Sequence, residues 1–357
     1  PVYRDVSDVA GIDKDGYGLG VNILDINMDG YKDIYVTNDY VSEDLFWINN
    51  RDGTFTNRLA DMLSHTSYSA MGSDVADINN DGLLDLFSLD MLPDVNVRAK
   101  MMANPSNYRN YVNEAFVNSF PQFTKNTLQL NMGAVNPGEL PVFSEIAALA
   151  NVEATDWSWS ALFADFNNSG SRDLFITNGI PRDITDKDFW SEYGRVRDIM
   201  PMNMALPKIP QVPAPNFIFE NNSDLTFTNR SIQWGFDEPG YSTGTVYADL
   251  DNDGDLDLVV NNTNSEAGIY RNNTIETDTS VQSNWLKVKL AGTEKNTNGL
   301  GTVLDLYFGD GAHQKHEQSV YRGYLSSVDP LLHFGTGEHA VLDSLKISYH
   351  LGNMRYE

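Results

Sequence analysis

A nine-residue acidic phrase occurs four times in the chain, at 25–33, 77–85, 165–173 and 249–257. Each copy has the form D-x-[DN]-x-[DS]-G-x-x-D, with oxygen-bearing side chains at positions 1, 3 and 5, glycine at 6 and a carboxylate at 9. Alternating oxygens on a sharp turn, together with the carbonyl of position 7, surround one point with hard ligands, which is the coordination that Ca²⁺ prefers. The four copies, called loops 1 to 4 in chain order, therefore predict up to four calcium sites.

The predicted ligands occupy equivalent positions in the four loops, with position 7 acting through its carbonyl. They are Asp25, Asn27, Asp29, Tyr31 and Asp33 in loop 1; Asp77, Asn79, Asp81, Leu83 and Asp85 in loop 2; Asp165, Asn167, Ser169, Ser171 and Asp173 in loop 3; and Asp249, Asp251, Asp253, Asp255 and Asp257 in loop 4. Side chains at positions 1, 3, 5 and 9 carry formal charges of −3, −3, −2 and −4. Loop 3 should therefore bind calcium most weakly and loop 4 most tightly.

Two other interpretations of the phrase are weaker. An EF-hand needs a bidentate glutamate at position 12, where this chain has Val36, Ser88, Ile176 and Val260. A simple polar hairpin turn would also use Asp, Asn and Gly, but four copies in one setting favour a metal. Two carboxylates about 4.5 Å apart repel by roughly 3–4 kcal/mol at an effective dielectric of about 20, so three in one loop call for a cation.

The elements that must position each loop form a longer repeat. A small residue stands five positions before each first aspartate, and a β-type run follows each ninth position. The small residues are Gly20, Gly72, Ser160 and Gly244, and the runs are Ile34–Thr37, Leu86–Leu89, Leu174–Thr177 and Leu258–Val260. A further apolar run follows and usually ends in asparagine. Four short strands at this spacing form one propeller blade, so we predict an all-β fold with at least four four-stranded blades over 1–280.

Two insertions interrupt the repeat. The first aspartates of successive units lie 52, 88 and 84 residues apart, so two units carry extra residues at about 91–125 and 181–215. We expect both insertions to be partly helical, the second near 186–199. They hold 9 of the 24 basic residues and 6 of the 11 methionines of an acidic chain. A Met-rich surface suits an adaptable protein interface; the alternative is that the insertions fill the propeller channel or cover a blade edge.

The repeat resembles the FG-GAP (VCBS-type) repeat, the calcium-loop blade of integrin α-subunit propellers and of many bacterial surface proteins. Residues 284–357 resemble the ASPIC/UnbV domain that follows such repeats in proteins similar to cartilage acidic protein. The motifs that carry this second likeness are Asn298-Gly299-Leu300-Gly301, Arg322-Gly323-Tyr324-Leu325-Ser326-Ser327, His333-Phe334-Gly335-Thr336-Gly337 and Asp343–Ile347. The family usually has Leu where Thr336 stands and Trp-Pro-x-Gly at 349–352. The resemblance implies a seven-bladed propeller that binds calcium, followed by a small β-domain.

The composition of the chain excludes several classes of partner and of metal site. The net charge of −26 and pI near 4.4 argue against nucleic acid or an anionic membrane surface as a partner. The chain has no cysteine, which excludes disulfides and cysteine-based zinc sites. No apolar run approaches the roughly 18 residues of a transmembrane helix, and the start lacks a signal-peptide pattern. Residues 2–6 look like the last strand of a preceding blade, so we expect a fragment whose signal or anchor lies elsewhere and whose terminal domain is truncated.

No nucleophile elbow, phosphate-binding glycine loop or zinc-protease motif occurs, so we expect no enzyme activity. The resemblance implies a secreted or cell-surface module for binding, adhesion or assembly that recognises a protein or glycan partner. The expected location is the exterior of a bacterial outer membrane. Membrane association would come only through an anchor or a partner. The alternatives are a polysaccharide lyase or hydrolase built on a calcium-bearing propeller, and a purely scaffolding subunit of an outer-membrane nutrient-uptake complex.

Overall fold

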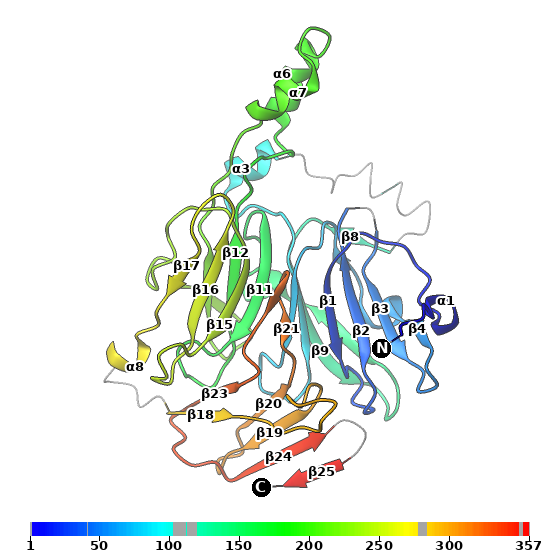
Figure 1. Ribbon diagram of the computed structural model, residues 1–357, viewed down its shortest axis with the longest axis vertical. Coiled ribbons are helices and arrows are strands. Elements are labelled where there is room, and N and C mark those ends of the chain that lie inside the picture. The colour runs from blue at the N-terminus through cyan, green and yellow to red at the C-terminus, as the bar shows by residue number, and fades with distance from the viewer. Residues whose placement is uncertain are drawn as a thin grey trace.

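Four antiparallel sheets stand side by side in the computed structural model, which describes residues 2–40, 42–102, 112, 120–277, 284–349 and 353–356 (Figure 1). Blade 1 comprises β1 (Gly18–Leu24), β2 (Asp33–Asn38), β3 (Leu45–Asn49) and β4 (Phe55–Asn57); blade 2 comprises β6 (Ser73–Ala76), β7 (Asp85–Ser88), β9 (Thr127–Ala134) and β10 (Pro141–Glu145); blade 3 comprises β11 (Ser158–Ala164), β12 (Asp173–Asn178), β13 (Phe217–Asn221) and β14 (Phe227–Asn229); and blade 4 comprises β15 (Ser242–Ala248), β16 (Asp257–Asn262) and β17 (Gly268–Tyr270). The predicted all-β class is confirmed. The described residues show neither a closed ring nor the seven blades that the resemblance implied.

Short helices connect or decorate the blades. They are α1 (Ser7–Ala10), α2 (Leu59–Met62), α3 (Asn96–Met101), α5 (Ala147–Ala150), α6 (Lys187–Val196), α7 (Met202–Ala205), the 3-10 turn η1 (Leu206–Lys208) and α8 (Thr274–Thr277), while β5 (Thr66–Ser67) pairs with β8 (Gln122–Phe123). The second insertion contains the expected helix, and it projects beyond the end of the blades that lies opposite the acidic loops (Figure 1). Of the first insertion, residues 103–111 and 113–119 lie outside the described residues.

The hydrophobic core lies between neighbouring blades. One cluster joins blades 1 and 2 through side chains such as Phe46 and Leu86, a second joins blades 2 and 3 through Phe87 and Phe163, and a third includes Phe175 and joins blades 3 and 4. Each large apolar side chain buried in this way contributes about 1.5–3 kcal/mol. Because each of the two middle sheets packs between two others, its strands are buried on both faces, as in Asp173–Asn178, where every residue is buried.

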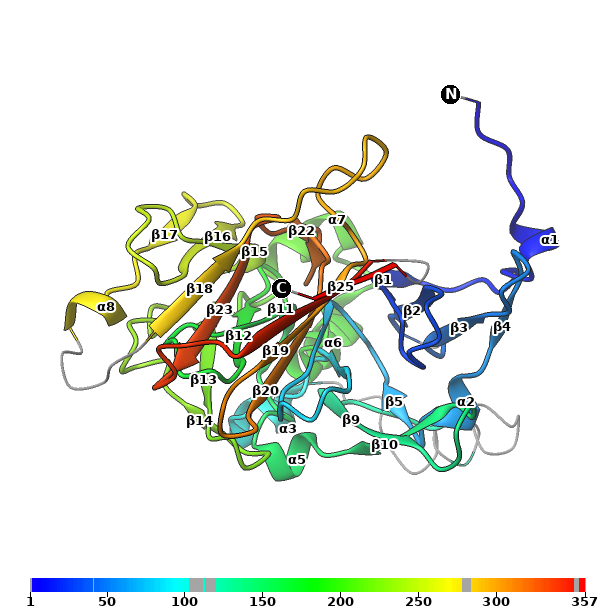
Figure 2. The same ribbon diagram turned by 90° about the horizontal axis from the view of Figure 1, so that it is seen from below.

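A smaller β-domain lies at the loop end of the blades (Figures 1 and 2). It comprises β18 (Asn284–Val288) paired with β23 (Leu332–Gly337), a sheet of β20 (His313–Glu317), β19 (Val303–Tyr307), β24 (Ser344–Tyr349) and β25 (Asn353–Tyr356), and a hairpin of β21 (Tyr321–Arg322) and β22 (Ser326–Ser327). Its own core includes Leu304, Leu306 and Phe334. The hairpin leaves this domain and runs along the first strands of blades 2, 3 and 4.

Three of the four small residues that stand five positions before the acidic loops contact this hairpin. A Cβ at Gly72 would lie 2.2 Å from the carbonyl oxygen of Trp159 in blade 3 and 3.0 Å from the Cβ of Tyr324 in the hairpin. The Tyr324 N–H donates to the Ser160 hydroxyl over 3.0 Å, and a Cβ at Gly244 would lie 2.9 Å from the Ser326 hydroxyl oxygen. Larger side chains on these first strands would displace the hairpin, so three of the four small positions are contact points for the C-terminal domain.

A buried ion pair fixes the hairpin. The Arg322 guanidinium donates from Nε to Asp74 Oδ1 over 2.8 Å and from Nη2 to Asp74 Oδ2 over 2.7 Å, and Nη1 donates to the Tyr247 hydroxyl over 2.8 Å. The side chains of Arg322 and Asp74 are only 6% and 2% exposed. Asp74 belongs to blade 2 and Tyr247 to blade 4, so one guanidinium joins two blades to the C-terminal domain.

We expect Arg322→Met to destabilise the protein by about 3–5 kcal/mol, because it leaves the Asp74 carboxylate buried without its partner. Equilibrium urea unfolding measures the loss. Lys14→Met is the matched control: Lys14 pairs with Glu43 on the surface, with side chains 48% and 31% exposed, and such a pair contributes about 0–1 kcal/mol.

A second substitution separates charge burial from lost packing. Asp74→Asn keeps an oxygen for the N–H of Phe163, which donates to Asp74 over 2.6 Å, but removes the charge. Added to Arg322→Met, it should recover part of the lost stability. If the double variant is less stable than Arg322→Met alone, the unpaired charge is not the source of the loss.

Candidate metal centres

The four acidic loops join the first and second strands of their blades and share one backbone conformation. Position 4 is left-handed in every loop, with φ of 55° at Met28, 58° at Asn80, 56° at Asn168 and 63° at Asn252. Position 6 also has positive φ, between 86° and 105°, and is always glycine. Glycine is favoured there because it alone adopts this conformation without steric penalty. The repeated backbone confirms that the four loops are the same structural unit.

The carboxylate at position 1 organises the turn. In loop 1, Asp25 Oδ1 accepts the N–H of Asp29 over 2.9 Å, and Asp25 Oδ2 accepts the N–H of Gly30 over 2.8 Å. The same pair of bonds recurs at Asp77 and Asp165. Positions 3 and 5 also accept N–H groups from two residues ahead. The loop backbone thus holds the side-chain oxygens of positions 1, 3 and 5 on one side of the turn.

The carboxylate at position 9 ties the loop to the third strand of its blade. Asp33 accepts the N–H of Ile26 over 3.1 Å and that of Asn49 over 2.9 Å. The Asn49 side chain in turn donates to the carbonyl of Lys32 over 3.1 Å. The equivalent sets are Asp85 with Ile78 and Asn131, Asp173 with Phe166 and Asn221, and Asp257 with Leu250 and Asn272.

These four asparagines were not predicted as site residues. The signal was present, because each lies in or just after the third strand of its unit, but the sequence alone does not say which group the amide contacts. Each carboxylate oxygen has two lone pairs, so a position-9 aspartate that accepts two N–H groups can still offer an oxygen to a cation.

Burial makes the loops electrostatically costly. The pKa of Asp33 is raised to about 7 and that of Asp85 to about 8, mainly by burial, and the neighbouring position-1 and position-5 carboxylates contribute to both shifts. The pKa of Asp77 rises to about 6 for the same reason, burial being the larger cause and Asp81 adding to it. A bound cation would favour the ionised carboxylates, because it offsets both their burial and their mutual repulsion.

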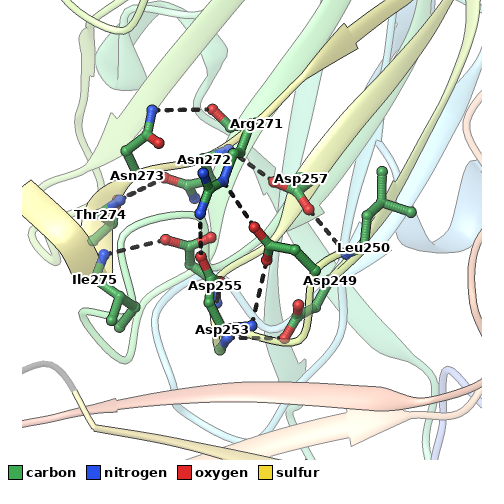
Figure 3. A network of polar contacts seen from close by, with 12 residues as sticks. Asp249, Leu250, Asp253, Asp255, Asp257, Arg271, Asn272, Asn273, Thr274 and Ile275 are labelled. Atoms are coloured by element: carbon green, nitrogen blue, oxygen red, sulfur yellow. Dashed lines mark hydrogen bonds and ion pairs between the residues drawn. The ribbon is translucent and has the colours of Figure 1, made fainter.

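Loop 4 brings three carboxylates close together among the described residues. Carboxylate oxygens of Asp249, Asp251 and Asp257 all lie within 4.8 Å of one another. Asp249 Oδ1, Asp253 Oδ2 and Asp255 Oδ1 are buried and accept no hydrogen bond within the described part of the chain (Figure 3). A buried carboxylate oxygen without a hydrogen bond is unfavourable. Asp253 Oδ2 also lies 3.6 Å from Arg271 Nη2, and three such oxygens around one turn fit the oxygen shell of a calcium ion.

Two basic side chains contact the same loop. The Lys287 ammonium pairs with Asp249, and Arg271 pairs through Nε with Asp251 over 2.8 Å and through Nη2 with Asp253 over 3.6 Å. The predicted ranking of calcium affinities counted only the formal charges at the ligand positions and did not include these two basic side chains. Lys287 comes from β18 in the C-terminal domain, and no repeat in the sequence connects it to loop 4.

The C-terminal domain contacts the other loops as well. Glu317 accepts the N–H of Asp25 over 3.2 Å and pairs with Lys32 over 2.7 Å. The Gln314 side chain donates to the carbonyl of Gly170 over 3.1 Å, and His333 Nε2 lies 2.7 Å from the side-chain oxygen of Asn168. Burial lowers the pKa of His333 to about 4, so the imidazole is neutral at physiological pH, as a structural hydrogen-bonding role requires.

No helix within the described residues has the length and apolar character needed to cross a bilayer.

Comparisons with known proteins agree with the repeats and with the terminal motifs. A family model described as an FG-GAP-like repeat matches residues 25–88 and 211–260, and a model described as ASPIC and UnbV matches residues 292–355. Cartilage acidic protein 1 of Homo sapiens is 25% identical over 361 residues, which cover 98% of this chain and 43% of that protein. The chain therefore spans less than half the length of this relative.

Among solved structures, the V. cholerae biofilm matrix protein Bap1 aligns over 98% of this chain and 60% of its own, with 9% identity and a TM-score of 0.29, at which the two folds are not equated. The assignment depends on the sequence motifs instead. The chain carries FG-GAP-like repeats followed by an ASPIC and UnbV domain.

Proposed function

We propose that this chain is a calcium-stabilised module that binds a protein or glycan partner outside the cell, without enzymatic activity. The observation that carries the proposal is loop 4, where three buried carboxylate oxygens accept no hydrogen bond among the described residues and surround one turn. Loops 1 to 3 have the same backbone and the same ligand positions. FG-GAP-like repeats and an ASPIC and UnbV domain suggest an adhesion-type module.

Calcium would act on stability. A site filled at about 100 times its dissociation constant adds about 2.7 kcal/mol, and a typical domain is stable by only about 5–15 kcal/mol. Four such sites at one end of the blades would therefore supply a large share of the total. Extracellular calcium modules commonly bind in the range of about 10⁻⁴–10⁻³ M, so sites of this strength would be filled outside the cell and empty in cytosol.

The partner surface that we propose is the pair of insertions at the opposite end of the blades. The described part of the second insertion exposes Ile184, Ile199 and Met204. Arg98 of α3 joins the two insertions, because it forms ion pairs with Asp183 and, over 3.3 Å, with Asp156. The insertions are thus anchored to each other and to blade 3 while presenting apolar side chains to solvent, which is typical of an interaction site.

Two other functions are compatible with the same loops. A polysaccharide lyase or hydrolase would convert a glycan, whereas a scaffolding subunit of an outer-membrane nutrient-uptake complex would neither bind nor convert one.

Removing calcium should lower the melting temperature sharply. We expect the midpoint of thermal unfolding to fall by at least about 10 °C when Ca²⁺ is replaced by excess EGTA, because the buried carboxylates of the loops then repel one another without a counter-ion. Differential scanning calorimetry measures the change. Magnesium at the same concentration is the control and should restore little, since it prefers a smaller octahedral site. An unchanged midpoint in EGTA would contradict the calcium proposal.

Lys287→Gln should strengthen calcium binding at loop 4 by at least about tenfold, because it removes a positive charge from beside the Asp249 carboxylate. Isothermal titration calorimetry of the whole chain gives the affinity of each class of site. Lys289→Gln makes the same change in net charge at an exposed position just after β18 and should leave binding unchanged. Equal effects of the two substitutions would show that only net charge matters.

A glycan panel separates the proposed function from its alternatives. We expect the chain to bind a glycan partner without cleaving it, so that neither new reducing ends nor unsaturated sugar ends appear. Deleting residues 187–205, which lie in the projecting insertion, should abolish binding but leave the calcium-dependent melting temperature unchanged. Turnover of any glycan would favour the enzyme.

A further inference from the structure

A small cavity lies where the C-terminal domain meets blades 1 and 2 and loop 3. Its volume is about 30 Å³, which is room for one or two water molecules or for one monatomic ion. Three positively charged and two negatively charged side chains take part in its lining. They are Arg172 of loop 3, Lys315 of β20 and Arg322 of β21, with Asp74 of β6 and Glu317 of β20. The lining therefore carries one positive charge in excess.

Both carboxylates of this lining already have cationic partners. Asp74 accepts two hydrogen bonds from the Arg322 guanidinium, over 2.8 Å and 2.7 Å. Glu317 pairs with Lys32 over 2.7 Å. The Lys315 ammonium in turn forms an ion pair with β19 over 3.8 Å. These pairs leave one cation of the lining without a counter-ion.

That cation is the guanidinium of Arg172. The residue is only 8% exposed, and it forms no ion pair within the described part of the chain. Its guanidinium carbon lies 5.5 Å from the centroid of the Phe334 ring, and Nη2 donates to His316 Nδ1 over 3.4 Å. A guanidinium has five N–H donors, so most of them lack an acceptor among the described residues. Burying a cation in this state is unfavourable.

The neighbouring acidic loops do not supply the missing acceptor. Burial lowers the pKa of Arg172, and the charges of Asp165 and Asp77 oppose this shift without cancelling it. Their carboxylates accept N–H groups of their own turns, from Gly170 over 2.7 Å and from Gly82 over 2.9 Å. Both carboxylates therefore lie near the guanidinium but are bonded within loops 3 and 2.

His316 provides a second donor in the lining of the cavity. A guanidinium donates hydrogen bonds but cannot accept one, so the Nδ1 atom that receives the Arg172 bond carries no proton. Burial, with the charges of Arg172 and Arg322, holds the pKa of His316 well below its ordinary value. The imidazole is therefore neutral, with its proton on Nε2. This N–H donates to no group within the residues that the structure describes.

We propose that the cavity binds one small monovalent anion, such as chloride, between the Arg172 guanidinium and the Nε2–H of His316. An anion accepts from both donors and supplies the missing negative charge, which a water molecule cannot do. The small volume favours a single-atom anion over phosphate or a carboxylic acid. The site goes beyond the proposed function, since no predicted calcium ligand and no residue of the insertions takes part.

The bound anion joins the C-terminal domain to blade 3. Arg172 lies between β11 and β12, whereas His316 belongs to β20. The anion therefore acts beside the ion pair of Arg322 and Asp74, which joins the same domain to blade 2. Stability of the whole chain should depend on the anion present in solution.

Anion exchange tests this dependence. Replacing chloride by methanesulfonate at equal ionic strength should lower the midpoint of thermal unfolding by about 2–4 °C, as expected when a site filled at about ten times its dissociation constant is emptied. Methanesulfonate has the same charge but is larger than one atom. Calcium is supplied throughout as its methanesulfonate salt at one concentration, so the acidic loops experience no change. Bromide should restore the midpoint. Equal midpoints in chloride and methanesulfonate overturn the proposal.

Arg172→Met should remove the anion dependence. In methanesulfonate this variant should be at least as stable as the unmodified chain, because an apolar side chain replaces a buried charge without a partner. Arg58→Met is the matched control and should keep the full dependence, since Arg58 is 45% exposed and pairs with Asp61 over 2.6 Å on the surface. An Arg172→Met protein that loses the same stability in both salts overturns the proposal.

Two substitutions of His316 test the second donor. His316→Gln retains an N–H group and should keep most of the anion dependence, whereas His316→Leu should lose most of it. Equal dependence in the two variants contradicts the assignment of His316 as a donor.

Bromide also locates the site directly. Diffraction data collected at the bromine absorption edge, from crystals of the unmodified chain grown in bromide, should show an anomalous peak between Arg172 and His316. A water molecule at this position, without anomalous signal, overturns the proposal.

Discussion

Each blade depends on one buried aspartate, the ninth residue of its acidic loop. Its two oxygens accept one N–H from the loop and one from an asparagine in or just after the third strand, and that asparagine returns a bond to the chain beside the aspartate. The loop that gathers oxygens and the sheet that carries it are therefore one hydrogen-bonded unit. The turn cannot change shape without disturbing the third strand, so the predicted cation ligands are held by hydrogen bonds within their own blade.

The repeated features could be predicted from the sequence, because repetition reveals them. The loop phrase, the strands that flank it and the small residue before it recur at fixed offsets, and the structure contains each of them. The asparagines Asn49 and Asn131 recur too, but their role depends on a bond across the sheet. A periodic pattern identifies equivalent positions without identifying what each side chain contacts.

Features that occur once could not be predicted in this way. Lys287 against Asp249 and Arg322 against Asp74 join the C-terminal domain to the blades, and neither pair belongs to a repeat. A single chain with many acids offers many partners for each basic residue, so charge alone does not select one. For the same reason the formal charge of loop 4 overstated how exposed its carboxylates are to a metal ion, since two basic side chains already contact them.

The buried pair of Arg322 and Asp74 also constrains the order of folding. The two residues are 248 positions apart, so during synthesis blades 2, 3 and 4 are complete long before the guanidinium exists. Burying the Asp74 carboxylate without it is unfavourable, and contacts of such long range form late. We therefore expect the inner strands of these blades to stay accessible to water until Arg322 has been synthesised, and the hairpin to complete their packing.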